Sequence, residues 1–281
     1  KLWEINTGKE IRTFKGHTWW VSTAVFSPDS KIILTASLDK TAKLWEINTG
    51  KEIRTFKGHT WWVSTAVFSP DSKIILTASL DKTAKLWEIN TGKEIRTFKG
   101  HTNGLNSAVF SLDGKSILTA SFDGTAKLWE KESGKVIRTF VGHTKGLTSA
   151  IFSPEEKYII TSSWDSTAKL WESESGKVIK NFTGHLNHVT SVAFSPDGKY
   201  IITASSDYSS KLWETATGKE IRTITGHLSW VNSVKFSLDG KYILTASSDN
   251  TAKLWETEYG KEIRVYAGHS GWVHKAIFNP D

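Results

Sequence analysis

The sequence predicts an all-β fold built from repeated four-stranded antiparallel units. Three observations lead to this prediction: a 42-residue period, four short β segments in every period, and no stretch left over for a crossover helix. The period is marked by the dipeptide Gly-His, which begins at Gly16, Gly58, Gly100, Gly142, Gly184, Gly226 and Gly268. Residues 1–281 are therefore expected to form a single domain of seven registers, the last of them truncated.

The first complete unit shows how each period divides. Its β segments are expected at residues 21–27, 31–37, 41–46 and 52–56, and Pro, Asp, Asn or Gly follows each segment, as turns require. The second segment is continuously apolar, which is typical of a strand covered on both faces. The fourth alternates and carries charge, so we expect it at the outer rim, where charge discourages edge pairing.

The composition excludes several classes of protein. Hydrophobic residues make up 38% of the chain and there are 14 Trp, so a packed core is expected. Cysteine is absent, which excludes disulfides, thiolate metal sites and cysteine nucleophiles. The sequence has no apolar run of membrane-spanning length and no signal-peptide pattern, which favours a soluble protein in the cytoplasm over a secreted or membrane protein. The absence of Met indicates a processed product, a fragment or part of a longer chain.

The formal net charge of +7 raises the possibility of nucleic-acid binding. The lysines of the KLW segments and of the Gly-Lys turns recur once per repeat, however, which spreads positive charge around the molecule instead of gathering it in one patch. We therefore expect a solvated surface, with nucleic acid an improbable partner and Lys145 the first residue to suspect if it binds.

The 42-residue period, the Gly-His opening, the Ser-x-Asp turn and the closing Trp resemble the WD-repeat family. The resemblance covers the whole chain and implies a seven-bladed β-propeller of four-stranded antiparallel blades. The seventh blade is expected to be incomplete, closed by strands from residues 1–14 and from about 272–279, with its second strand missing. The family's Trp-Asp pair is Trp-Glu here, as at Trp45-Glu46, and we expect little structural consequence.

The resemblance also implies a hydrogen-bonded structural tetrad in each complete unit, in which the Trp indole donates to Ser, Ser to His, and His to Asp. A Ser-His-Asp hydrolase is the alternative, but repetition of the same set in six units argues against a catalytic centre. The six expected tetrads are His17, Ser37, Asp39, Trp45; His59, Ser79, Asp81, Trp87; His101, Ser121, Asp123, Trp129; His143, Ser163, Asp165, Trp171; His185, Ser205, Asp207, Trp213; and His227, Ser247, Asp249, Trp255.

No catalytic residue, metal site or cofactor is expected. One periodic His per unit spaces these side chains too widely for zinc, and the extra His188 and His274 form no cluster in the sequence. An enzyme would need a non-repeating acid, base or nucleophile in the central channel, and the sequence indicates none.

Positions that vary between repeats are the candidates for partner binding. The middle residue of the Ser-x-Asp turn is apolar in four consecutive units. The resemblance implies that the loop after Gly-His lies on the same face, where it adds Trp in two of these units. The candidate residues are Trp19, Leu38, Trp61, Leu80, Phe122 and Trp164. Grouped exposed aromatic residues favour a protein or peptide partner, while the alternative is that they cover the blade tops. Trp20, Trp62, Trp230 and Trp272 are expected to pack.

Residues 1–60 are identical to residues 43–102, exposed turns included. Recent duplication or deliberate design explains this identity better than selection at each position. The main hypothesis is therefore a non-catalytic adaptor or receptor module, and its alternative is an amplified or designed propeller without an evolved ligand. Identical units also permit exchange between chains, so both a monomer and a blade-exchanged oligomer are expected possibilities.

Overall fold

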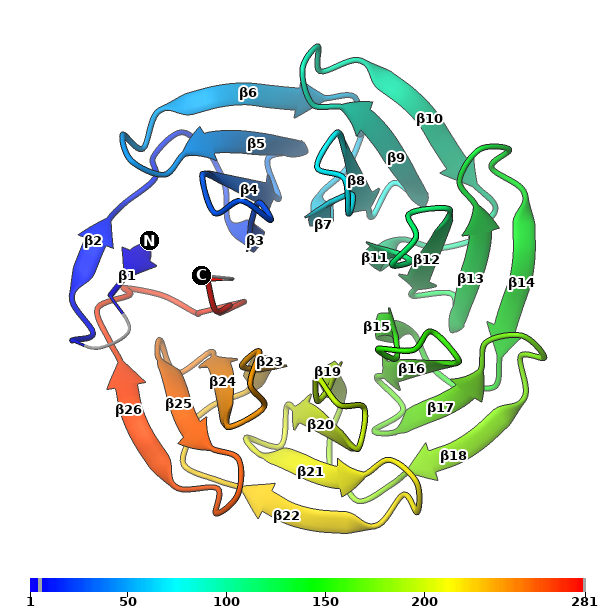
Figure 1. Ribbon diagram of the computed structural model, residues 1–281, viewed down its shortest axis with the longest axis vertical. Helices are drawn as coiled ribbons and strands as arrows, with labels where there is room; N and C mark the ends of the chain where they lie inside the picture. The colour runs from blue at the N-terminus through cyan, green and yellow to red at the C-terminus, as the bar shows by residue number, and fades with distance from the viewer. Residues whose placement is uncertain (5–6, 280–281) are drawn as a thin grey trace.

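The computed structural model describes residues 1–4 and 7–279, and its ribbon is a ring of β-sheets around a central opening (Figure 1). The described residues form six four-stranded antiparallel sheets and one two-stranded sheet. The first sheet runs outward from the centre in the order β3 (Val21–Phe26), β4 (Ile32–Ser37), β5 (Thr41–Glu46), β6 (Glu52–Lys57). No helix in this part of the chain is long and apolar enough to cross a membrane.

The other five complete sheets repeat this order from inside to outside. Their strands are β7 (Val63–Phe68), β8 (Ile74–Ser79), β9 (Thr83–Glu88), β10 (Glu94–Lys99); β11 (Leu105–Phe110), β12 (Ser116–Ser121), β13 (Thr125–Glu130), β14 (Val136–Val141); β15 (Leu147–Phe152), β16 (Tyr158–Ser163), β17 (Ala168–Glu172), β18 (Val178–Phe182); β19 (Val189–Phe194), β20 (Tyr200–Ser205), β21 (Ser210–Glu214), β22 (Glu220–Ile224); and β23 (Val231–Phe236), β24 (Tyr242–Ser247), β25 (Ala252–Glu256), β26 (Glu262–Tyr266).

The hydrophobic core lies between neighbouring blades. In the first interface, Leu34 of β4 and Phe56 of β6 pack in one cluster with Ile75 and Trp87 of the second sheet. Strand β4 is buried from Ile33 to Ser37, as its sequence predicts, and the second blade packs on one of its faces. Five such clusters join the six complete blades in succession.

A belt of hydrogen bonds also joins the inner strands of successive blades. The second residue of each inner strand donates from its side chain to a backbone carbonyl of the next blade: Ser22 to Val63 (2.7 Å), Ser64 to Leu105 (2.6 Å), Asn106 to Leu147 (2.6 Å), Thr148 to Val189 (2.7 Å), Thr190 to Val231, and Asn232 to Val273 (3.0 Å). The belt sets the spacing of the blades around the opening.

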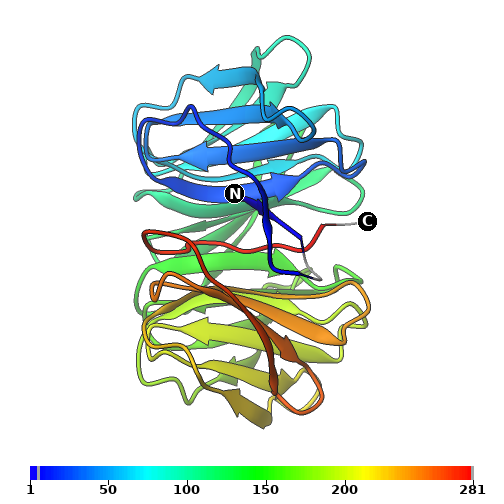
Figure 2. The ribbon, with the colours of Figure 1, turned by 90° about the vertical axis from the view of Figure 1, so that its left-hand side faces the viewer.

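The two ends of the chain meet between the first and sixth complete blades. Strand β1 (Leu2–Trp3) pairs only with β2 (Glu10–Arg12) within the described residues, and the segment 273–279 lies inward of them (Figures 1 and 2). The expectation of a strand at about 272–279 is wrong for the described part of this segment, which forms no ladder. The segment forms no ladder because the second strand of this register, with which it would pair, has no counterpart in the sequence. The described chain therefore has six complete blades and these terminal strands.

Replacing Thr148 by Val tests the inter-blade belt. The Thr148 hydroxyl donates to the Val189 carbonyl and accepts from Ser162 Oγ at 2.7 Å, so T148V should lower the free energy of unfolding by about 1 kcal/mol. Urea denaturation followed by Trp fluorescence measures this change. Thr144→Val is the matched control, since the exposed Thr144 hydroxyl makes no hydrogen bond within the described residues. Equal losses in both variants would contradict a role for the belt.

Candidate functional site

A hydrogen-bonded network ties the loop after each Gly-His to the strands behind it. In the first complete unit, His17 Nδ1 lies 2.7 Å from Asp39 Oδ2, and His17 Nε2 lies 2.7 Å from Thr35 Oγ1. The Trp45 indole Nε1 donates to the same threonine oxygen at 2.7 Å. A consistent proton order runs from Trp45 to Thr35, from the Thr35 hydroxyl to His17, and from His17 Nδ1 to Asp39.

The serine of the predicted tetrad was wrong: the bridging hydroxyl belongs to a threonine two residues earlier. Trp45 pairs with Ile33 across the strands, so its indole reaches Thr35, the next residue on that face. Ser37 instead ends the strand, where its hydroxyl accepts from the Asp39 amide (3.1 Å) and donates to the carbonyl of Trp19.

In all six complete units, a Thr takes the bridging position that was expected for Ser, and the Ser holds the turn. The bridging residues are Thr35, Thr77, Thr119, Thr161, Thr203 and Thr245. The serines that hold the turn are Ser37, Ser79, Ser121, Ser163, Ser205 and Ser247.

Burial fixes the protonation of the network, as the third unit shows. Burial lowers the pKa of His101, and the nearby Asp123 carboxylate opposes this only in part. Burial by itself would raise the pKa of Asp123, but hydrogen bonds from Thr125, His101 and the Thr102 amide outweigh it and hold that pKa below its usual range. A neutral His and a charged Asp thus form a fixed structural unit in which both imidazole nitrogens are occupied, by Asp123 and by Thr119.

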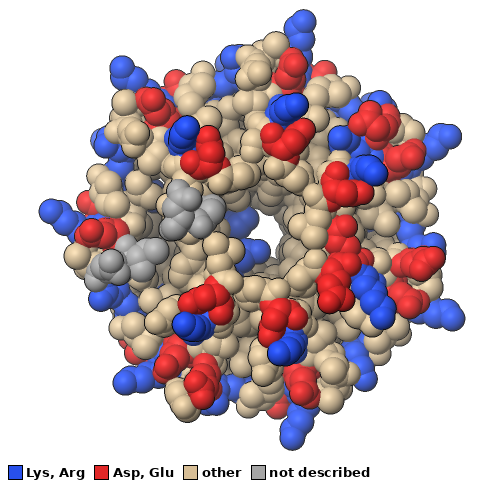
Figure 3. All heavy atoms as spheres, in the orientation of Figure 1, with Lys and Arg blue, Asp and Glu red and all other residues tan. Residues whose placement is uncertain are grey.

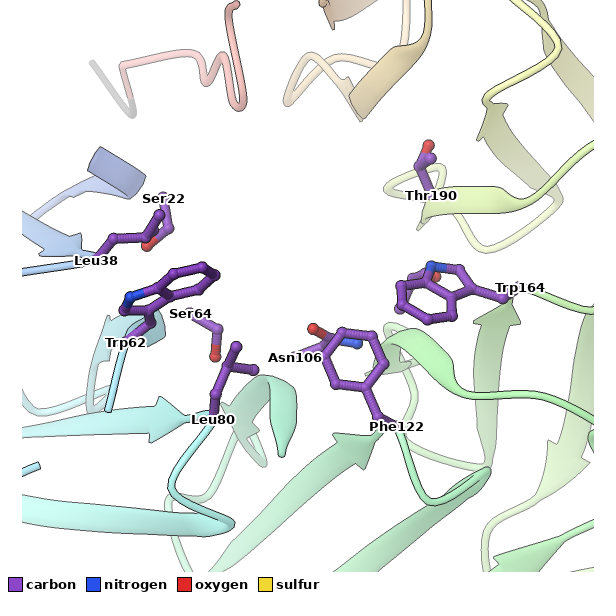
Figure 4. Close-up of a pocket in the computed structure, with 10 residues that line it drawn as sticks. Ser22, Leu38, Trp62, Ser64, Leu80, Asn106, Phe122, Trp164 and Thr190 are labelled. Carbon is purple, nitrogen blue, oxygen red and sulfur yellow. The ribbon is translucent and has the colours of Figure 1, made fainter. Parts of the chain in front are cut away.

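The mouth of the central channel lies where the Ser-x-Asp turns meet the loops after Gly-His. The amide of Leu38 donates to the carbonyl of Trp20 at 2.9 Å, and the five other complete units repeat this bond between turn and loop. A cavity of about 270 Å³ opens here, lined by Leu38, Trp62, Leu80, Phe122 and Trp164 above the polar belt (Figure 4). The structure thus brings together four of the six candidate binding residues.

The other two candidates, Trp19 and Trp61, do not line this cavity. They are 60% and 52% exposed, respectively. Lys40 lies over the Trp61 ring, with its Nζ 5.9 Å from the ring centroid, and Trp61 also contacts Trp62.

The tryptophans expected to pack are exposed, so that prediction was wrong. Trp62 is 39% and Trp20 60% exposed, and Trp230 and Trp272 lie between these values. Ring contacts join Trp20 to Trp272 (6.1 Å) and Trp272 to Trp230 (6.2 Å).

Turn residues of two other blades form a second group of rings in contact. Phe122 and Trp164 are in contact, with ring centroids 4.5 Å apart, and Trp164 stacks on His188 at 5.5 Å. Each of the seven registers supplies one ring. We call this set the aromatic rim; it consists of Trp20, Trp62, Phe122, Trp164, His188, Trp230 and Trp272.

Two glycines make room for large turn residues at the channel mouth. Gly104 and Gly146 occupy the loop position that is Trp in other units. A Cβ on Gly104 would lie 2.9 Å from the Leu80 Cα, and one on Gly146 would lie 3.0 Å from the Phe122 Cα. Glycine therefore lets Leu80 and Phe122 lie against the next blade. In the sequence, this arrangement is visible as Gly at a loop position where other repeats have Trp or His, in the repeat that follows a large apolar turn residue.

Two lysines on the inner segments were missed from the sequence. Lys235 stands where the other complete units have Val, Ile or Ala, and Lys275 stands where they have Thr or Ser. Lys275 Nζ donates to Thr23 Oγ1 of the first blade at 2.7 Å. The sequence indicated no non-repeating acid, base or nucleophile in the central channel, and that interpretation overlooked these two amines. An alignment of the sequence at a spacing of 42 residues would have revealed both positions.

Part of the surface charge is paired. Five KLW lysines form ion pairs with glutamates of β2 or of the outer strands: Lys1 with Glu10, Lys43 with Glu52 (2.7 Å), Lys85 with Glu94 (2.7 Å), Lys211 with Glu220 (3.0 Å) and Lys253 with Glu262 (2.8 Å). The face in Figure 3 shows both signs around the ring. Residues 1–4 and 7–279 contain no group of three or more His, Asp or Glu side chains that could hold a metal ion.

Two family models match this chain. Residues 1–172 match the family model of the IFT122 first β-propeller, and residues 176–214 and 218–256 match the model of the WD domain, G-beta repeat. A stretch of 43 residues is 44% identical to nuclear distribution protein PAC1 of Arthroderma otae, Arthroderma benhamiae and Trichophyton verrucosum. The stretch covers 15% of this chain and 9% of each relative, so the chain matches less than a tenth of their length.

Replacing Thr119 by Val tests the network. The variant leaves the Trp129 indole N–H and His101 Nε2 buried without their partner, and should lower the free energy of unfolding by about 1 to 3 kcal/mol. Thr119→Ser keeps the hydroxyl and is the matched control, with a smaller loss. Chemical denaturation measures both, and a Val variant as stable as the Ser variant would show that the hydroxyl does not bridge Trp and His.

Proposed function

The chain belongs to the WD-repeat β-propeller family, through the IFT122 first β-propeller model that covers residues 1–172, and on that premise we propose that it is a non-catalytic scaffold. Its partner is a protein or a peptide, bound on the face that carries the Ser-x-Asp turns. Propellers of this family typically serve as protein-interaction scaffolds. The repeated His and Asp belong to structural networks, which leaves binding as the role of the exposed variable residues.

The aromatic rim is the observation that carries this proposal. Its tryptophans keep between 39% and 60% of their surface exposed around one opening, although such side chains favour burial. Grouped exposed aromatic side chains favour interaction sites, and Trp is enriched among the residues that dominate binding energy. The cavity between Trp62 and Trp164 offers a place where an apolar side chain of the partner would be enclosed.

The identity of residues 1–60 and 43–102 favours a second reading, an amplified or designed propeller that has no evolved ligand. The rim itself argues for the first. Its members Phe122, Trp164 and His188 lie outside the duplicated stretch, at positions where one unit differs from the next. Selection from a peptide library separates the two readings, because a propeller without a ligand site selects no consensus peptide.

Changing two rim residues and the cavity residue Leu80 should weaken binding without unfolding the chain. A peptide or protein selected by the wild-type chain should bind the Leu80→Ser, Phe122→Ser, Trp164→Ser variant at least about tenfold more weakly, a loss of about 1.4 kcal/mol or more. Calorimetric titration measures the affinity, and circular dichroism verifies the fold.

The matched control changes Leu112 and Leu238 to Ser. Both are exposed and lie in turns at the opposite ends of the strands from the Ser-x-Asp turns. This control should bind like the wild type. If the control loses binding while the rim variant keeps it, the partner binds the other face.

We also propose that β1, β2 and the segment 273–279 belong to a seventh blade whose second-strand position is open. Trp3 lies 5.6 Å from the ring of His269, much as Trp45 lies 5.9 Å from His17 in the first complete unit. Such a Trp-His pair needs a Thr and an Asp to complete its network, and in the complete units both come from the second strand and the turn after it.

A synthetic peptide with the sequence of residues 30–42 tests this proposal. It carries the strand, the Thr and the Asp of a complete unit, and should raise the thermal midpoint of the chain in a concentration-dependent way by binding the folded state. The control peptide has Pro in place of Leu34, which blocks ladder pairing. Equal effects of the two peptides would contradict an open strand position.

A further inference from the structure

The inner segments of the ring carry Lys or Arg at only two described positions, Lys235 and Lys275. The residues equivalent to Lys235 are Val25, Val67, Val109, Ile151 and Ala193, and those equivalent to Lys275 are Thr23, Thr65, Ser107, Ser149, Ser191 and Ser233. All of these are neutral. Both departures from the repeat introduce the same charge, and they fall on neighbouring segments of the ring.

The structure brings the two lysines to one side of the opening. The segment 273–279 lies between β23 and β3, because the Ala276 amide donates to Ser233 Oγ at 3.3 Å and Lys275 Nζ donates to Thr23 Oγ1 at 2.7 Å. Lys235 lies on β23, the innermost strand of its sheet. Figure 3 shows atoms of Lys or Arg on the wall of the central opening, which is open to solvent.

Neither amine has a counter-charge in the described part of the chain. No carboxylate of residues 1–4 or 7–279 forms an ion pair with Lys235 or Lys275, whereas Lys43, Lys85, Lys211 and Lys253 each have a glutamate partner. Burial lowers the pKa of Lys235. Burial and the charge of Lys235 together lower the pKa of Lys275 to about 7. Two half-buried amines without an anion are costly, and a bound anion relieves that cost.

We propose that this wall of the channel binds a small polyanion that carries phosphate or carboxylate groups. The ammonium groups of Lys235 and Lys275 hold its oxygens through charge-assisted hydrogen bonds. The buried Thr23 hydroxyl oxygen accepts from Lys275 Nζ and so fixes where that ammonium group lies. This site is independent of partner binding at the aromatic rim.

Calorimetric titration of the full chain with tripolyphosphate and with citrate, at pH 6.5 and at ionic strength fixed with sodium chloride, tests the site. The wild type is expected to bind at least one of the two at one site per chain. Tighter binding of tripolyphosphate identifies phosphate as the preferred group, and tighter binding of citrate identifies carboxylate. Binding of neither above the chloride background overturns the proposal.

Variants taken from the other repeats assign the site. The double variant Lys235→Val, Lys275→Ser carries the residues of equivalent blades and should weaken binding at least about tenfold. The double variant Lys51→Gln, Lys93→Gln removes the same charge from exposed turns and should bind like the wild type. Unchanged affinity in the channel variant, or an equal loss in both, overturns the proposal.

A stability measurement keeps the test independent of misfolding. Without added anion the channel variant should have a thermal midpoint at least as high as the wild type, since it removes two unpaired amines. Tripolyphosphate or citrate, whichever binds, should raise the midpoint of the wild type and not that of the channel variant. An equal rise in both chains would place the anion elsewhere and overturn the proposal.

Discussion

The hydrogen-bonded chain from Trp through Thr and His to Asp is the interaction on which the rest of the structure depends. It connects the third strand of a blade, its second strand, the loop that enters it and the Ser-x-Asp turn, for example through Trp129, Thr119, His101 and Asp123. Because turn and loop are held together, the aromatic rim that they carry has a defined geometry. A structural network thus positions the surface that we assign to binding.

Local sequence features predicted the blades well. The expected second, third and fourth strands of the first unit agree with β4, β5 and β6 to within one residue, because turn residues and apolar runs act locally. The bridging hydroxyl depends on register instead. Thr35 and Ser37 lie on the same face of one strand, and alternation cannot separate them. Only the pairing of Trp45 with Ile33 shows which hydroxyl the indole reaches.

The rim and the channel lysines depend on contacts between units, which a periodic pattern does not contain. The recurrence of Trp20, Trp62, Trp230 and Trp272 suggested packing, yet each indole is buried only if a neighbouring loop covers it. Lys235 and Lys275 occupy different positions of the repeat, and the path of the terminal segment between β23 and β3 brings them together. Both features are exceptions to the repeat, and both are where the proposals lie.

Hydrogen–deuterium exchange of the wild type and the Thr119→Val variant is the most direct test of the claim that the network positions the binding face. The account predicts faster exchange of the Phe122 and Asp123 amides, which bond to Gly104 and Ser121, with no change at the Gly114 amide in the opposite turn. Exchange that rises equally at both ends of the blade, or at neither, would contradict it.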